Sequence, residues 1–149
     1  MKSKKILPPT YLLLSIVLMV ALRFPFPVMT VVPFPWNLLG TLPLVLGAII
    51  NVMADRAFKL AHTTVKPFQE SSALITGGVF RFTRNPMYLG FLLILIGIAV
   101  LLESLTPFVV VPVFAVLLDR LYIVVEERML AAKFGVKWQE YRQNTRRWL

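Results

Sequence analysis

Cysteine is absent from this sequence, and histidine occurs only once, as His62. The lack of cysteine excludes disulfide bonds, thiolate catalysis and metal sites built from cysteine. One histidine is too few for the multi-histidine sites that zinc enzymes use. We therefore expect no metal cofactor.

Acidic residues are also scarce, because seven Asp and Glu stand against sixteen Lys and Arg. In a soluble protein this excess of positive charge would suggest a nucleic-acid partner. Here the cations flank apolar segments, so anionic lipid headgroups are the simpler partner. We expect binding to membrane lipids and none to nucleic acid.

Hydrophobic residues are abundant and occur in long blocks. They make up 58% of the chain, and only 15% of residues are charged, compared with about 25% in soluble domains. The apolar residues in these blocks do not have the spacing of amphipathic helices. They therefore indicate helices that are surrounded by lipid. The composition predicts an integral membrane protein.

Four membrane-spanning helices can be placed, at residues 7–22, 36–54, 86–102 and 106–125. At 1.5 Å per residue, helices of this length reach roughly 24 to 30 Å, which is the thickness of a bilayer core. No small-residue cleavage site follows the first block, so we interpret it as a retained span and not as a signal peptide. The prediction is an all-α membrane protein with a single domain over residues 1–149.

Two further segments lie outside these spans. Four prolines, at positions 25, 27, 33 and 35, exclude a regular helix between the first two spans. After the fourth span, Gly135 is expected to end the helix. A short amphipathic helix over 137–146, within the tail 126–149, is then expected to lie along the membrane surface.

The distribution of cations predicts the orientation of the chain. They precede the first span, fill the 55–85 loop and follow the fourth span, whereas the opposite side carries only Arg23. The positive-inside rule then places both termini and the loop in the cytosol, at the inner membrane if the chain is prokaryotic. His62 lies in this loop, where we interpret it as an ordinary interfacial side chain, with a general base as the alternative.

Glycines recur at helical spacing on the second and third spans. Gly40 and Gly47 are seven residues apart, as are Gly90 and Gly97. Small residues at this spacing allow two helix backbones to approach closely in lipid. We predict close packing at Gly40, Gly47 and Gly97, and a second role for Gly90 given below.

The first candidate site is the start of the third span. Asn85 can cap a helix whose first residue is Pro86, and Arg84 adds positive charge to the exposed N–H groups, which suits an anion. Tyr88 and Gly90 follow within the next turn, one as a hydrogen-bond donor and the other leaving room for a ligand. The alternative is a well-capped helix with a basic anchor.

The second candidate site is the end of the fourth span. Asp119 and Arg120 lie deep in the apolar block, where ionisable residues are functional candidates, and Glu126 and Glu127 follow. The alternative is that Asp119 pairs with Arg120 and that the glutamates form a solvated helix end. With the cationic helix start on the same membrane face, the two sites could bind the carboxylate and the ammonium group of a zwitterion separately.

Residues 76–90 resemble the Arg-[His/Asn]-Pro-x-Tyr-x-Gly signature of the isoprenylcysteine carboxyl methyltransferase and phospholipid methyltransferase superfamily. The later Glu-Glu-x-x-Leu, Phe-Gly, paired-aromatic and terminal-Arg pattern is matched by Glu126 to Leu130, Phe134-Gly135, Trp138, Tyr141 and Arg147. The resemblance covers roughly residues 58–149. Asn85 stands where many members have histidine, as in phospholipid N-methyltransferases and small prokaryotic members.

The resemblance implies S-adenosylmethionine as the cofactor and transfer of its methyl group to a carboxylate or amine on a lipid-like or prenylated acceptor. It also implies which residues contact the cofactor: Arg84, Asn85, Pro86, Tyr88, Gly90, Glu126 and Glu127. Arg120 or Arg147 is expected to orient an anionic acceptor. The alternatives are a nicotinamide-dependent membrane reductase of related architecture and a non-catalytic membrane subunit.

Overall fold

The structure, a computed structural model, describes residues 6–24, 29–69 and 71–149. Lys2, Lys4 and Lys5, which entered the orientation argument, and Pro25 and Pro27 lie outside the described residues. The described chain is helical and contains no strand beyond a single antiparallel bridge between Thr30 and Ser104. The predicted all-helical class is therefore confirmed.

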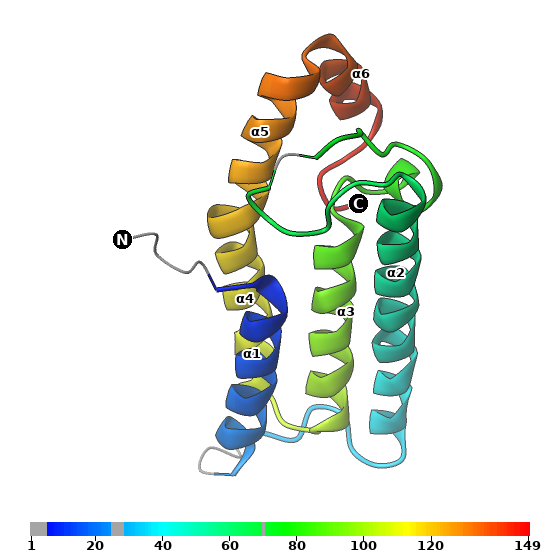
Figure 1. The fold of residues 1–149 in the computed structure, drawn as a ribbon. Coiled ribbons are helices and arrows are strands. Elements are labelled where there is room, and N and C mark those ends of the chain that lie inside the picture. The colour runs from blue at the N-terminus through cyan, green and yellow to red at the C-terminus, as the bar shows by residue number, and fades with distance from the viewer. Residues whose placement is uncertain (1–5, 25–28, 70) are drawn as a thin grey trace.

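The helices stand side by side, with α3 between α1 and α2 (Figure 1). They are α1 (Pro8–Arg23), α2 (Thr41–Leu60), α3 (Pro86–Leu101), α4 (Val110–Leu118), α5 (Val124–Phe134) and α6 (Val136–Asn144). Short 3₁₀ turns precede three of them: η1 (Trp36–Gly40), η2 (Gly78–Arg81) and η3 (Thr106–Val109). A π-helical turn, η4 (Asp119–Ile123), joins α4 to α5.

Two continuous helices are long and apolar enough to cross a membrane, Trp36–Leu60 and Thr106–Phe134. The second runs through η3, α4, η4 and α5, well beyond the predicted end at residue 125. The other two predicted spans are apolar helices of 16 residues each, α1 and α3. Four helical blocks thus lie where the sequence predicted them, and their number of membrane crossings stays a prediction.

The outer surface of the helices is apolar. Exposed side chains on α1, α2 and α4 include Leu13, Leu42 and Val113, each at least 60% exposed. Water would disfavour such a surface, whereas lipid tails accept it. The main buried cluster lies inward, where α1, α3 and α4 meet around Met19, Leu95 and Phe114.

Glycines bring α2 and α3 into direct backbone contact. A Cβ atom added to Gly47 would lie 2.4 Å from the carbonyl oxygen of Gly90, and one added to Gly40 would lie 2.5 Å from that of Gly97. These distances are too short for any side chain, so only glycine permits this approach. The predicted packing role of Gly40, Gly47 and Gly97 is confirmed.

The C-terminal segment folds back over the start of α3. Gly135, with φ of +50°, ends α5 as predicted, because glycine adopts left-handed φ readily. Helix α6 follows one residue earlier than predicted and buries Trp138 and Tyr141 against Ala54 and Phe80. The last residues then run back beside α3 (Figure 1). The position of α6 at a membrane surface stays a prediction.

Candidate functional site

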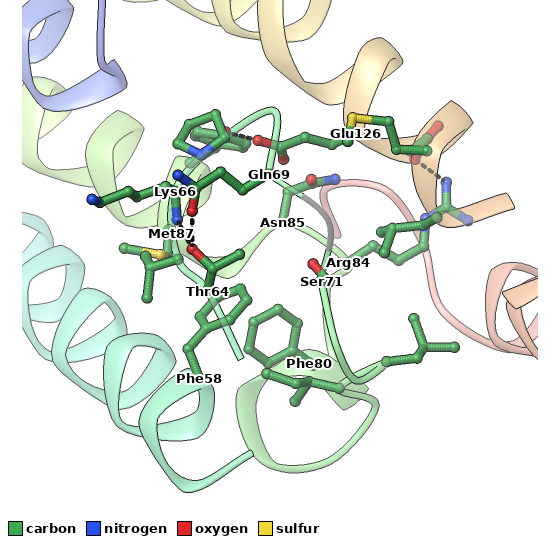
Figure 2. Close-up of a pocket in the computed structure, with 18 of the residues that line it drawn as sticks. Phe58, Thr64, Lys66, Gln69, Ser71, Phe80, Arg84, Asn85, Met87 and Glu126 are labelled. Carbon is green, nitrogen blue, oxygen red and sulfur yellow. Dashed lines mark hydrogen bonds and ion pairs between the residues drawn. The ribbon is translucent and has the colours of Figure 1, made fainter. Parts of the chain in front are cut away.

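A cavity of about 640 Å³ lies at the end of the bundle where α3 begins. Small-molecule sites occupy about 300–1,000 Å³, so the cavity is large enough for a cofactor. Its walls come from the start of α1, the end of α2, the 64–75 loop, the start of α3, and α5 and α6. Figure 2 shows side chains from these segments pointing into one space.

Most of the lining is apolar or aromatic. The ring of Phe58 meets that of Phe80 edge to face, with centroids 5.5 Å apart. Phe68, from the loop, stacks at 5.5 Å on Tyr122 beneath the cavity wall. Such a lining excludes water from a ligand and accepts a hydrocarbon or aromatic group.

The polar end of the cavity contains the carboxylate of Glu126. The Tyr88 hydroxyl donates a 2.7 Å hydrogen bond to Oε1 of Glu126, and both residues line the cavity. The two nearby arginines, Arg84 and Arg147, pair with Glu127 and not with Glu126. A half-buried carboxylate at the cavity favours a ligand that carries positive charge.

Arg84 is fixed in place from several directions. Its Nη1 donates to the carbonyls of Arg142 and Thr145, and its Nη2 donates to Glu127 at 3.0 Å. The guanidinium also lies 5.7 Å from the centre of the Trp138 ring, a cation–π distance. Its Nε is buried and has no hydrogen-bond partner among the described residues. The guanidinium is therefore fixed through its two Nη groups.

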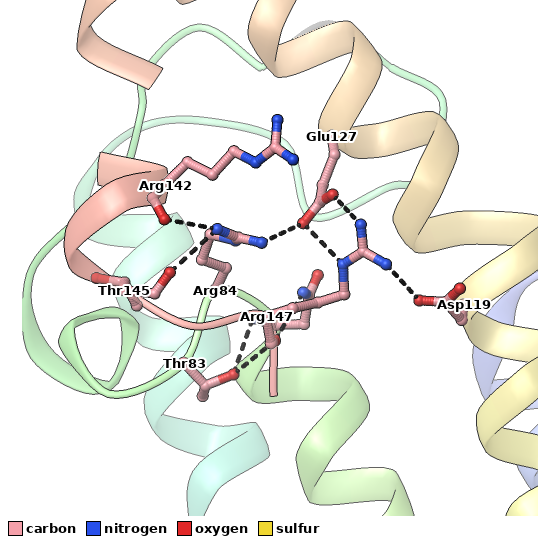
Figure 3. A network of polar contacts seen from close by, with 8 residues as sticks. Thr83, Arg84, Asp119, Glu127, Arg142, Thr145 and Arg147 are labelled. Atoms are coloured by element: carbon pink, nitrogen blue, oxygen red, sulfur yellow. Dashed lines mark hydrogen bonds and ion pairs between the residues drawn. The ribbon is translucent and has the colours of Figure 1, made fainter. Parts of the chain in front are cut away.

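Arg147 is held by two carboxylates at once (Figure 3). Its Nη2 lies 2.5 Å from Glu127 and its Nη1 lies 3.0 Å from Asp119. The carbonyl of Arg147 accepts hydrogen bonds from the Thr83 hydroxyl and from Nδ2 of Asn85, at 3.1 and 3.0 Å. The C-terminal residues are therefore attached to both α3 and the long fourth helix.

The structure corrects one expectation about this end of α3. Pro86 begins the helix as predicted, but the side chain of Asn85 makes no capping hydrogen bond. Its amide donates to Arg147 instead, because the tail comes close enough to supply a carbonyl. Arg84 and Glu127 pair with each other, and the binding of a zwitterion by the two sites stays a prediction.

Most of the predicted cofactor residues do meet at this cavity. Its lining includes Arg84, Asn85, Pro86, Tyr88, Glu126 and Glu127. Gly90 lies elsewhere, because it faces α2, where an added Cβ would lie 2.1 Å from Nδ2 of Asn51. Its place in the structure is helix packing.

The remaining predicted residues lie outside the cavity. The side chain of Arg120 is 78% exposed, and its Nε lies 4.0 Å from the nearer carboxylate oxygen of Asp119. Arg147 lies closer to Asp119, at 3.0 Å, and is therefore its main partner. Arg147 itself is engaged with carboxylates. His62 has a φ of +48° and its carbonyl accepts a hydrogen bond from Ser72.

Sequence reasoning expected the 55–85 loop to help build a cytosolic site but named none of its residues. The 64–75 segment contributes Val65, Phe68 and Gln69, and the end of α2 contributes Phe58. A signal was present, because several apolar residues stand in a loop that was expected to be cytosolic. Apolar side chains in such a loop indicate that the loop packs against the rest of the protein or a ligand.

Comparison with known proteins identifies the family. A family model described as phospholipid methyltransferase matches residues 35–137. Protein-S-isoprenylcysteine O-methyltransferase A of Arabidopsis thaliana is 34% identical over 112 residues, which are 70% of this chain and 54% of that protein. A probable protein-S-isoprenylcysteine O-methyltransferase of Oryza sativa subsp. indica is 33% identical over 111 residues, 70% of this chain and 56% of that protein.

A solved structure shares the fold. The eukaryotic intramembrane Ras methyltransferase, isoprenylcysteine carboxyl methyltransferase, superposes with a TM-score of 0.72 at 24% identity, over 95% of this chain and 52% of that one. The present chain thus spans about half the length of the relatives that it matches. It belongs to the phospholipid methyltransferase family, and the resemblance seen in the sequence is confirmed.

Proposed function

We propose that this protein transfers the methyl group of S-adenosylmethionine to a carboxylate or amine on a lipid-like or prenylated acceptor, at the cytosolic face of the membrane. The observation that carries the proposal is the cavity, which joins an apolar, aromatic space to the carboxylate of Glu126. The names of the family and of the relatives point to the same reaction class.

The residues present fit this cofactor. S-adenosylmethionine carries a sulfonium and an ammonium group, and Glu126 supplies a carboxylate at the cavity that lies outside the Arg84–Glu127 ion pair. It also carries a carboxylate, which suits the positive end of α3 beside the Arg84 guanidinium. The aromatic lining suits an adenine ring.

The pairing of Arg84 with Glu127 changes how these roles are divided. We assign the cationic groups of the cofactor to Glu126, its carboxylate to the positive start of α3 beside Arg84, and one of its hydrogen-bond donors to the side-chain oxygen of Asn85. Pro86 and Tyr88 shape the same end, and Tyr88 orients the Glu126 carboxylate. Glu127 holds the two arginines in place and contacts the cofactor only at the edge of the cavity.

When bound, the cofactor supplies an activated methyl group, so the protein needs little acid or base chemistry. What this chain's residues contribute is the placement of nucleophile and methyl in line, with water excluded by the aromatic walls. Arg147 has no donor that faces the cavity, so we assign it no contact with the acceptor. Arg120, exposed at the side of the bundle, remains the candidate for an anionic acceptor headgroup.

The first test measures binding by titration calorimetry in detergent. Wild-type protein should bind S-adenosylhomocysteine and not NADPH, which separates a methyltransferase from a reductase of similar architecture. Glu126→Gln should weaken binding by about 1.5–3 kcal/mol, as expected for a charged hydrogen bond. Glu140→Gln is the matched control, because Glu140 is exposed on α6. Preferred binding of NADPH, or of neither ligand, would refute the proposal.

The second test identifies the product and its side of the membrane. Labelled S-adenosylmethionine is offered with a lipid extract and, separately, with a pool of soluble metabolites. Label is expected in the lipid fraction, and tags at both termini should be accessible from the cytosol while a tag beside Ser104 is not. Label in soluble acceptors alone would contradict the lipid-like substrate class.

A further inference from the structure

The π-helical turn η4 interrupts the longest helix of the molecule at a charged residue. It covers Asp119–Ile123, between α4 and α5. Such turns accommodate one more residue than an α-helical turn and often occur at functional sites. Here the turn begins at Asp119, an ionisable residue at a depth where such residues are rare.

The turn changes which residues of the long helix face the same side. Asp119 and Glu127 are eight positions apart, so in an uninterrupted α-helix they would be rotated by about 80° from each other. One extra residue in a turn removes about 100° of rotation, which leaves the two carboxylates within about 20° of a common line. This alignment allows one guanidinium, that of Arg147, to contact both.

The guanidinium links this aligned pair to the cavity. Arg147 binds Asp119 and Glu127 with its side chain, and its carbonyl accepts from Nδ2 of Asn85. Because Nδ2 is engaged, the amide of Asn85 is held in one orientation, with its oxygen left for a ligand. Next to it, the backbone N–H of Arg84 donates to the carbonyl of Arg146 at 2.9 Å.

We propose that Asp119 is a positioning residue for the cofactor site: through Arg147 it fastens the C-terminal segment to the start of α3 and so fixes Asn85 and Glu127. Asp119 does not line the cavity, so its effect on a ligand passes through Arg147. This inference rests on the proposed function, because the ligand whose affinity it sets is the proposed cofactor.

The test is a double-mutant cycle on binding of S-adenosylhomocysteine to the full-length protein. Asp119→Asn keeps the shape of the side chain and removes its charge, and Arg147→Gln removes the other partner. Each single variant should bind about tenfold more weakly, and the double variant should bind no more weakly than the worse single variant. Independent effects would instead multiply to about one hundredfold.

Two controls separate this role from general damage. Asp55→Asn removes an acid from an exposed pair with Lys59 on α2, and it should change affinity by less than about twofold. Asp119→Glu retains the charge and should restore affinity to within about threefold of wild type.

A readout without ligand tests the fastening itself. Amide hydrogen exchange in residues 145–149 should be faster in Asp119→Asn than in wild type, while exchange in α2 and α3 is unchanged. Unchanged exchange in the tail would contradict the inference, and faster exchange throughout would show that Asp119 serves the whole fold and not the tail.

The outcomes also separate this inference from the proposed function. If wild type binds S-adenosylhomocysteine and Asp119→Asn binds it equally tightly, only the role of Asp119 is wrong. The same holds if the two substitutions act independently. If wild type does not bind the ligand, the proposed function is wrong, and the inference falls with it.

Discussion

The body of α3 and its start are held in the molecule by different physical means. The body packs on α2 through backbone and aliphatic contacts at Gly40, Gly47, Gly90 and Gly97. The start is joined to α5, α6 and the C-terminal segment by ionic, cation–π and hydrogen-bonded contacts centred on Arg84. The first region depends on shape, and the second depends on the chemistry of particular side chains.

This difference teaches where substitutions should affect stability and where they should affect ligand binding. Tight packing without charge leaves no room for a ligand, so the glycine contacts form a rigid support. The polar end leaves Nε of Arg84 buried without a hydrogen-bond partner, which a molecule optimised only for stability would avoid. Four predictions, from the largest expected effect to the smallest, test this division.

The largest effect is expected for Gly47→Leu. An added side chain would overlap the carbonyl of Gly90, which lies 2.4 Å from the Cβ position, and neither backbone can move without separating α2 from α3. We expect a loss of more than about 3 kcal/mol, which is a large part of the stability of an ordinary protein. Denaturant unfolding in detergent measures it. Gly77→Leu is the control, because nothing lies within 4 Å of its Cβ position; equal stability of both variants would contradict the tight packing.

At the polar end, Arg84→Lys should weaken binding of S-adenosylhomocysteine by about 10- to 100-fold while leaving the unfolding midpoint close to wild type. The donors of a lysine all lie on one nitrogen, which cannot occupy both positions that the two Nη atoms of Arg84 fill, and lysine presents no flat face to Trp138. Calorimetric titration gives the affinity. Arg81→Lys, at an exposed position on η2, should bind like wild type, and a similar loss in both variants would argue against a specific role for Arg84.

A smaller effect is expected for Tyr141→Phe, which joins α6 to η2. The Tyr141 hydroxyl donates to the carbonyl of Phe80 at 2.6 Å, and its loss should cost about 1 kcal/mol of unfolding free energy. Burial raises the pKa of Tyr141 to about 12 from 10.0, so its contribution should be complete below about pH 10 and be lost as pH rises toward 12. Unfolding measured at pH 8 and pH 11.5 tests this. The gap between wild type and variant should narrow at the higher pH.

The smallest effect per change concerns the acceptor chain. If the acceptor reaches the cavity sideways from the lipid, each CH₂ removed from its chain should weaken apparent affinity by up to about 0.8 kcal/mol. A series of acceptors with one headgroup and decreasing chain length measures it. An affinity that does not depend on chain length would contradict lateral access.

The fold could be predicted from the sequence where local signals decide it. Pro86 and Gly135 mark helix ends by their own backbone preferences, and the seven-residue spacing of Gly40 and Gly47 indicates a packing face within one helix. Apolar block length located the four long helical segments for the same reason. These features depend on residues close together in the chain.

The candidate site could be predicted in its members but not in its pairing. Arg84 and Glu127 were both identified as site residues, but their direct contact was not predicted. Arg84 donates hydrogen bonds to Glu127 and to the carbonyl of Arg142, which lie 43 and 58 residues later in the chain. Likewise, the side chain of Asn85 does not cap α3 as expected, because its amide donates to the carbonyl of Arg147. No local sequence pattern predicts the π-helical turn η4 either. It lies between two residues, Asp119 and Glu127, that both contact Arg147.

Arg147 follows Asn85, Asp119 and Glu127 in the sequence, which sets an order of folding. These three residues leave the ribosome before the arginine that joins them. The contacts that close the polar end of the bundle therefore form after the helices that carry the other partners. Removal of the Arg147 side chain should leave those helices formed and the C-terminal segment detached from them.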